Sequence, residues 1–190
     1  MKRIVLTGGP CSGKTVLTTR LAELHPDRYV RVPEAATQVY AALQTRWDRL
    51  DLEGRRDAQR RMYRLQREQE DRLAAQHPDQ VLLLDRGTID GAAYWPDGVD
   101  AYWPDVGTTL DRELARYDAV LWMQTSAALG IYDGDASNAC RFEDASAAVT
   151  AGEKLIDLWS RHPRLVRIDA YPTINQKLEA VDGVLRSVQK

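Results

Sequence analysis

The sequence predicts an α/β fold in three layers, with a five-stranded parallel sheet in the middle. Short apolar runs alternate along the chain with longer segments whose apolar residues recur at helical spacing. Such runs are typical of parallel strands that helices cover on both faces. The predicted strands span residues 4–6, 29–32, 81–84, 119–123 and 165–168.

Helices are predicted between and after these strands. The first begins at Lys14 and is ended by His25-Pro26. Residues 51–75 form a long polar helix, whose interleaved basic and acidic residues are typical of a solvated face. Residues 125–142 are loop-like and have the length of a lid. The other helices are predicted over about 35–45, 109–117, 143–161 and 173–188.

Size and composition predict a single domain over residues 1–190. Apolar residues make up 44% of the chain and charged residues 28%, as in globular proteins with a full core. The net charge of −2 gives no general attraction to nucleic acid, and no run approaches the length of a membrane helix. The two cysteines, Cys11 and Cys140, form no disulfide framework, which favours a cytoplasmic location. The sequence does not indicate an oligomeric state.

The first predicted strand leads into the glycine-rich segment GGPCSGKT, residues 8–15. It matches the pattern G-x-x-x-x-G-K-[ST] between a strand and a helix, in which backbone N–H groups surround a phosphate. The helix N-terminus adds a favourable dipole. The segment therefore predicts binding of ATP or GTP, with Lys14 on the β- and γ-phosphates and Thr15 on Mg²⁺. The predicted phosphate-binding residues are Gly8, Gly9, Pro10, Cys11, Ser12, Gly13, Lys14 and Thr15.

Charged residues follow two other predicted strands. Asp85 ends the apolar run VLLLD, a position from which a carboxylate holds Mg²⁺ or orients the nucleophile. Arg86 comes next and is either a phosphate contact or a surface arginine. Glu34 follows the second strand, where it accepts a proton from a substrate hydroxyl, or favours the N-terminus of the next helix, or both. Whether Glu34 or Asp85 is the base stays open at this point.

Two further places are candidates for the site. Arg141 stands at the far end of the predicted lid, where it either closes over the γ-phosphate or pairs with a neighbouring acid. Asp90 and Tyr94 are four residues apart on a predicted helix. They either line an acceptor pocket or have purely structural roles.

Four segments together resemble a known family: IVLTGGPCSGKT, VPEAAT, LLLDRGTIDGAAYWP and SRHPRLVRID. They are similar to the NadR-like P-loop ATPases, which have a ribosylnicotinamide-kinase-like AAA domain, and the resemblance covers nearly the whole chain. It implies a nucleoside- or nucleotide-kinase-like P-loop fold that binds ATP or GTP with Mg²⁺. It also implies phosphate binding by Gly8, Gly13, Lys14 and Thr15, and metal or catalytic work by Asp85. For Glu34 it suggests an acceptor-side role, and for Arg141 a lid role.

The sequence leaves two classes of function open. The first is a kinase that transfers the γ-phosphate to a small, hydroxyl-bearing, nucleoside-like acceptor. The second is a nucleotide-dependent switch that hydrolyses slowly and presents a changed surface to a protein or lipid. Catalysis by the kinase would consist of positioning and charge neutralisation by Lys14, Mg²⁺ and arginines.

Overall fold

The computed structural model describes residues 2–130 and 145–188. Its sheet has five parallel strands in the order β2-β3-β1-β4-β5. Leu6 near the end of the central strand is aligned with Asp85 on one side and with Leu121 on the other. The carboxyl ends of three strands therefore meet at one edge of the sheet. The strands are β1 (Arg3–Thr7), β2 (Tyr29–Val32), β3 (Val81–Asp85), β4 (Ala119–Met123) and β5 (Leu165–Ile168).

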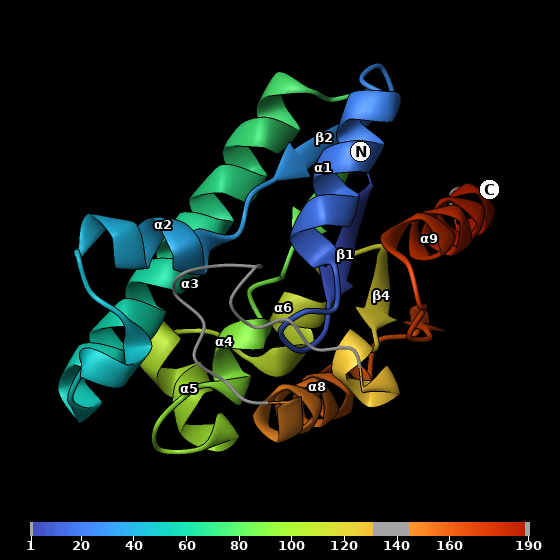
Figure 1. The fold of residues 1–190 in the computed structure, drawn as a ribbon. Coiled ribbons are helices and arrows are strands. Elements are labelled where there is room, and N and C mark those ends of the chain that lie inside the picture. The colour runs from blue at the N-terminus through green and yellow to red at the C-terminus, as the bar shows by residue number, and fades with distance from the viewer. Residues whose placement is uncertain (1, 131–144, 189–190) are drawn as a thin grey trace.

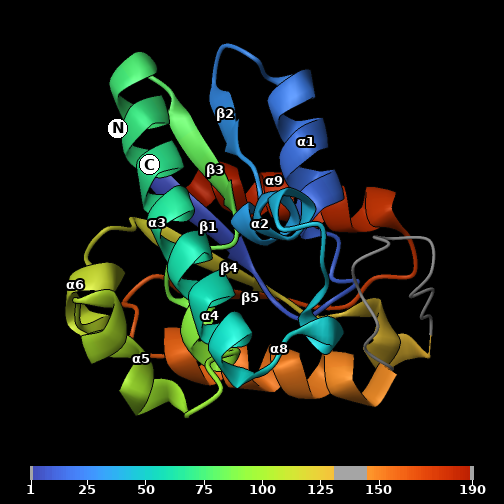
Figure 2. The ribbon, with the colours of Figure 1, turned by 90° about the vertical axis from the view of Figure 1, so that its left-hand side faces the viewer.

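Helices cover both faces of the sheet (Figures 1 and 2). One face carries α1 (Lys14–Leu24) and α9 (Ile174–Val188). The other carries α3 (Leu52–Gln76) and α8 (Ala145–Trp159), with α4 (Asp90–Ala93), α5 (Val99–Val106) and α6 (Leu110–Leu114) beside them. The short α2 (Ala35–Ala42) packs on α3 and is followed by the 3₁₀ turn η1 (Trp47–Arg49); a second turn, η2 (Ser126–Leu129), follows β4. The predicted three-layer α/β fold is confirmed.

Alternate residues of the strands enter the two layers of the core. In β1, Val5 packs with Leu82, Leu84 and Trp159 on the α3 face. Ile4 and Leu6 pack with Leu17 of α1 on the opposite face. All of these side chains are fully buried, so the sheet is a rigid platform for the loops at its edge.

The structure differs from the sequence prediction in two segments. The helix expected over about 35–45 ends at Ala42, since Gln44 adopts a positive φ of 50°. The segment after Tyr94 contains a helix, α5, that was not predicted and that holds Pro104. No helix of the described residues is long and apolar enough to cross a membrane.

A buried lysine lies on α9. Lys177 is 5% exposed, and its Nζ donates a hydrogen bond of 2.6 Å to the carbonyl oxygen of Gln124, just after β4. Burial lowers the pKa of Lys177 from 10.5 to about 8, and Asp169 opposes the shift. Between these two pH values the folded state therefore binds fewer protons than the unfolded state.

We predict that wild type gains stability relative to Lys177→Met as the pH rises from about 8 to about 10.5. Below this interval the lysine is charged in both states, so the full cost of burying the charge is present. Above the interval it is neutral in both, and the cost is gone. Urea unfolding at each pH should give a slope approaching about 1.4 kcal/mol per pH unit. Lys154→Met, on the exposed face of α8, should give a flat difference from wild type. A flat difference for Lys177→Met would contradict the prediction.

Candidate functional site

The loop between β1 and α1 has backbone angles that its glycines permit. Gly8 has a φ of 138°, and a Cβ built there would lie 2.2 Å from the carbonyl oxygen of Met123. Gly13 has a φ of 89° and is the N-cap of α1. Side chains at these two positions would be strained, and at Gly8 one would also collide with backbone. The loop therefore takes the tight path of a phosphate-binding loop.

The ammonium group of Lys14 lies inside this loop. Its Nζ donates to the carbonyl oxygens of Gly8 and Gly9 at 2.9 and 2.8 Å, and to the Ser12 hydroxyl at 3.0 Å. The side chain is only 2% exposed. The segment after β4 supports the loop from outside, because the Thr125 hydroxyl donates to the carbonyl oxygen of Pro10 at 2.7 Å. A positive charge is therefore held where the motif predicts a phosphate.

Asp85 lies at the end of β3 and is fully buried. Burial raises its pKa, the carboxylate of Glu34 raises it further, and Lys14 and Thr15 oppose the rise. Its Oδ2 is 3.4 Å from a guanidinium nitrogen of Arg31. Its Oδ1 is buried and has no hydrogen-bond partner in the described part of the chain. Asp85 thus has an oxygen available beside the hydroxyl-bearing Thr15.

Arg86 connects three segments of the chain. Its Nε donates to Glu34 Oε1 at 2.8 Å, and a terminal nitrogen reaches Asp90 Oδ2 at 3.1 Å. The same nitrogen lies 3.5 Å from the carbonyl oxygen of Gly8 in the loop. Asp90 also accepts hydrogen bonds from Thr7 at 2.8 Å and from the indole of Trp159 at 2.8 Å. The guanidinium therefore lies between two buried carboxylates at the edge of the phosphate-binding loop.

A cavity of about 250 Å³ opens next to Arg86. It reaches Pro10 of the loop, and Glu34 lies in its wall with 8% of its surface exposed. Most of the wall is aromatic or apolar, which is usual for sites that hold a small organic molecule. Its residues include Glu34, Thr37, Tyr40, Trp47, Gln59, Met62, Tyr63, Gln66, Arg86, Thr88, Asp90, Tyr94 and Tyr102.

Helix α3 contributes to this wall, which was not predicted from the sequence. Gln59, Tyr63 and Gln66 occupy one face of that helix and are each at most 6% exposed. Gln59, which is 4% exposed, lies in the cavity wall. The spacing of three, four and seven residues was the available signal, since it places the three side chains on one face. The arginines, expected on a solvated face, are spread around the helix: Arg61 and Arg64 are exposed, Arg60 pairs with Asp105 at 2.6 Å, and Arg67 donates to the Tyr63 hydroxyl at 3.0 Å.

Part of the expected site lies outside the described residues. Arg141, expected to close over the γ-phosphate, is one such residue, and so is most of the predicted lid over 125–142. The described beginning of that segment forms η2, where Ser126 donates to the carbonyl oxygen of Cys11 at 3.1 Å. Among residues 2–130 and 145–188, no cluster of three or more His, Cys, Asp or Glu side chains could hold a metal ion by itself.

Comparison with known proteins adds a family and a fold. Residues 3–177 match the family model described as an AAA domain. Among curated proteins, no sequence matches the chain. Structures similar to this one include NadR in complex with NAD and AMP-PNP, at 16% identity, and NadR in complex with NR, at 20% identity, each with a TM-score of 0.65. All of this chain is covered in both, but it spans only 50% of either NadR chain.

A second kind of structure matches over its whole length. Deoxyadenosine kinase from M. mycoides, with products dCMP and a flexible dCDP bound, has a TM-score of 0.65 at 13% identity, with 97% of this chain and 99% of that chain covered. At such identities the likeness establishes a shared fold. The expected resemblance to NadR is confirmed at the level of family and fold. Since the family model spans most of the sequence, the chain belongs to the AAA-domain family of P-loop proteins.

Proposed function

We propose that the chain is a P-loop kinase that transfers the γ-phosphate of ATP or GTP to a hydroxyl group of a small, nucleoside-like acceptor. The observation that carries the proposal is the position of the cavity. It opens directly beside the phosphate-binding loop, with Glu34 and Arg86 in its wall. A protein that only bound and hydrolysed a nucleotide would not need a second enclosed space there. The kinase fold shared with deoxyadenosine kinase and NadR supports the same conclusion.

The nucleotide would occupy the loop 8–15, with its phosphates on the backbone N–H groups and on Lys14. Lys14 already lies within this loop. The Oδ1 of Asp85, which has no hydrogen-bond partner among the described residues, and the Thr15 hydroxyl fit a Mg²⁺ site of hard oxygen ligands, to which the nucleotide would add its own oxygens. When bound, Mg²⁺ supplies neutralisation of phosphate charge.

Glu34 is the better candidate for the base that accepts the proton of the acceptor hydroxyl. Its carboxylate is in the cavity wall, whereas Asp85 is fully buried beneath the loop. Hydrogen bonds from Arg86 at 2.8 Å and from the Thr37 hydroxyl at 2.7 Å fix its orientation. Positioning of the hydroxyl by Glu34, with charge balance from Arg86 and Lys14, would account for catalysis.

The cavity wall favours an acceptor without a phosphate group. Among the described lining residues Arg86 is the only cation, and two carboxylates already bind it. The carboxamide of Gln59, in the cavity wall, would offer one donor group and one acceptor to a planar polar edge, such as that of a nucleobase. Aromatic rings of the wall would pack against the faces of such a base. An uncharged nucleoside-like compound fits these features.

The fate of labelled phosphate tests the proposal. We predict that protein, Mg²⁺ and γ-labelled ATP or GTP, given a pool of nucleosides and other hydroxyl metabolites, transfer label to an organic acceptor. Lys14→Ala should lower the rate at least about 100-fold, since it removes a stabilising charge from the transition state. The control Lys154→Ala, on an exposed position of α8, should match wild type. Label released only as free phosphate, whatever the pool contains, would favour the nucleotide-dependent switch instead.

A second prediction concerns Glu34. Glu34→Gln keeps the size of the side chain and removes its basicity, so kcat should fall about 100- to 10,000-fold. Nucleotide affinity, measured by calorimetry, should stay within about threefold, because Glu34 faces the acceptor cavity. Glu23→Gln, on the exposed side of α1, is the matched control. Nearly full kcat in Glu34→Gln would contradict the prediction and would indicate Asp85 as the base instead.

A further inference from the structure

The segment that presents Arg86 to the site has a constrained backbone. Arg86 has a φ of 76°, a left-handed conformation that non-glycine residues rarely adopt. Such a conformation persists only where surrounding contacts hold it. Gly87 follows immediately, and a Cβ there would come within 2.9 Å of the Trp159 ring. The segment 86–88 is therefore enclosed by its neighbours.

The backbone of this segment makes two backbone hydrogen bonds, from the N–H of Arg86 to the carbonyl oxygen of Leu6 and from the N–H of Asp90 to that of Gly87, each at 3.1 Å. Side chains bind its other polar groups. Gln66 donates to the carbonyl oxygen of Arg86 at 3.2 Å. The Tyr117 hydroxyl accepts a hydrogen bond from the N–H of Thr88 at 2.8 Å. The Tyr102 hydroxyl donates to the carbonyl oxygen of Thr88 at 3.1 Å. Three side chains from α3, α5 and the segment after α6 thus fix both sides of Gly87.

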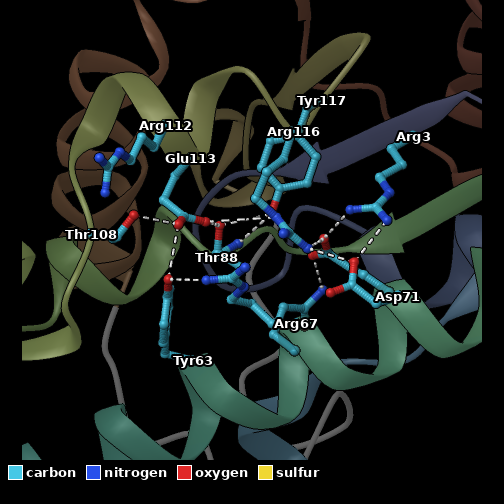
Figure 3. Close-up of polar contacts among 12 residues, drawn as sticks. Arg3, Tyr63, Arg67, Asp71, Thr88, Thr108, Arg112, Glu113, Arg116 and Tyr117 are labelled. Carbon is cyan, nitrogen blue, oxygen red and sulfur yellow. Dashed lines mark hydrogen bonds and ion pairs between the residues drawn. The ribbon is translucent and has the colours of Figure 1, made fainter.

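Two buried glutamates accept hydrogen bonds from the side chains of this network. Glu70 is fully buried and accepts hydrogen bonds from Gln66 and Tyr117, each at 3.0 Å, and from Arg116 at 2.8 Å. Glu113, 2% exposed, accepts from the hydroxyl of Thr88 at 2.6 Å and from that of Tyr63 at 2.8 Å. Figure 3 shows Thr88 next to Tyr117 and Glu113, and Arg116 between Glu113 and Asp71.

We infer that Tyr117 is a positioning residue for phosphoryl transfer, which acts by holding the segment 86–88 so that the guanidinium of Arg86 stays between Glu34 and the phosphate-binding loop. The inference rests on the proposed function for its kinetic consequence. Tyr117 is the best probe of the network because its one hydroxyl group contacts Thr88 and Glu70 at the same time.

Removal of that hydroxyl has a specific local effect. Tyr117→Phe leaves the N–H of Thr88 buried without a partner, at a residue that is 2% exposed. The aromatic ring remains in its T-shaped contact with Trp159, at a centroid distance of 5.4 Å. The segment 86–88 is then free to relax from the conformation that gives Arg86 its positive φ. The hydroxyl does not contact Arg86 itself, so its effect on that guanidinium passes through the segment 86–88 and the side chains bound to it.

The test combines kinetics with a direct observation of Arg86. Tyr117→Phe should lower kcat about tenfold, while the KM for the nucleotide stays within about twofold. In a background of Arg86→Lys, the same substitution should cost less than about twofold, because the two changes act on one group. Hydrogen exchange of the Arg86 Nε–H group, followed by ¹⁵N NMR, should become about tenfold faster in Tyr117→Phe. Tyr29→Phe, a buried tyrosine of β2 that is 2% exposed, should change none of these quantities.

The outcomes separate this inference from the proposed function. Equal losses of kcat in both backgrounds, at temperatures well below every melting point, would show a general structural role and overturn the inference. Unchanged Nε–H exchange in Tyr117→Phe would also overturn it. If wild type transfers no phosphate but the exchange of Arg86 still accelerates, the proposed function fails and the positioning of Arg86 by Tyr117 stands.

Discussion

The guanidinium of Arg86 is the contact on which the geometry of the site depends. It joins Glu34 after β2, Gly8 after β1 and Asp90 of α4. Each carboxylate is nearly buried, and a buried carboxylate without a cation would be costly. A single cation therefore compensates both of them and also contacts the phosphate-binding loop at the carbonyl oxygen of Gly8. Loss of this cation would leave two repelling carboxylates at the edge of that loop.

The rest of the fold maintains the position of that cation. The parallel sheet brings the ends of β1, β2 and β3 to one edge, so that residues far apart in sequence come within hydrogen-bonding distance. Helix α3 contributes to the site in two ways: Gln59 and Tyr63 line the cavity, and Glu70 accepts a hydrogen bond from Tyr117. In the proposed kinase, the groups that would bind phosphate and acceptor and those that support Arg86 are in this way built on one rigid core.

The sequence was sufficient to predict the five strands and the placement of the phosphate-binding loop, because apolar runs and glycine positions are local signals. The position of Glu34, Asp85 and Arg86 at one edge of the sheet could also be predicted, since parallel strands point the same way. The residues of the cavity wall could not be predicted in this way. Gln59 and Gln66 are polar residues in a strongly polar helix, and their burial depends on partners distant in sequence. The bond from Trp159 to Asp90 spans 69 residues and has no local signature.

The proposed reaction depends on a phosphoryl acceptor that binds between Glu34 and the phosphate-binding loop. The most direct measurement is a crystal structure with the acceptor and a non-hydrolysable nucleotide bound together. The predicted result is an acceptor oxygen within about 3.2 Å of a Glu34 carboxylate oxygen and in line with the γ-phosphate. An acceptor bound outside the cavity, or with its reacting oxygen on Asp85 and away from Glu34, would contradict it.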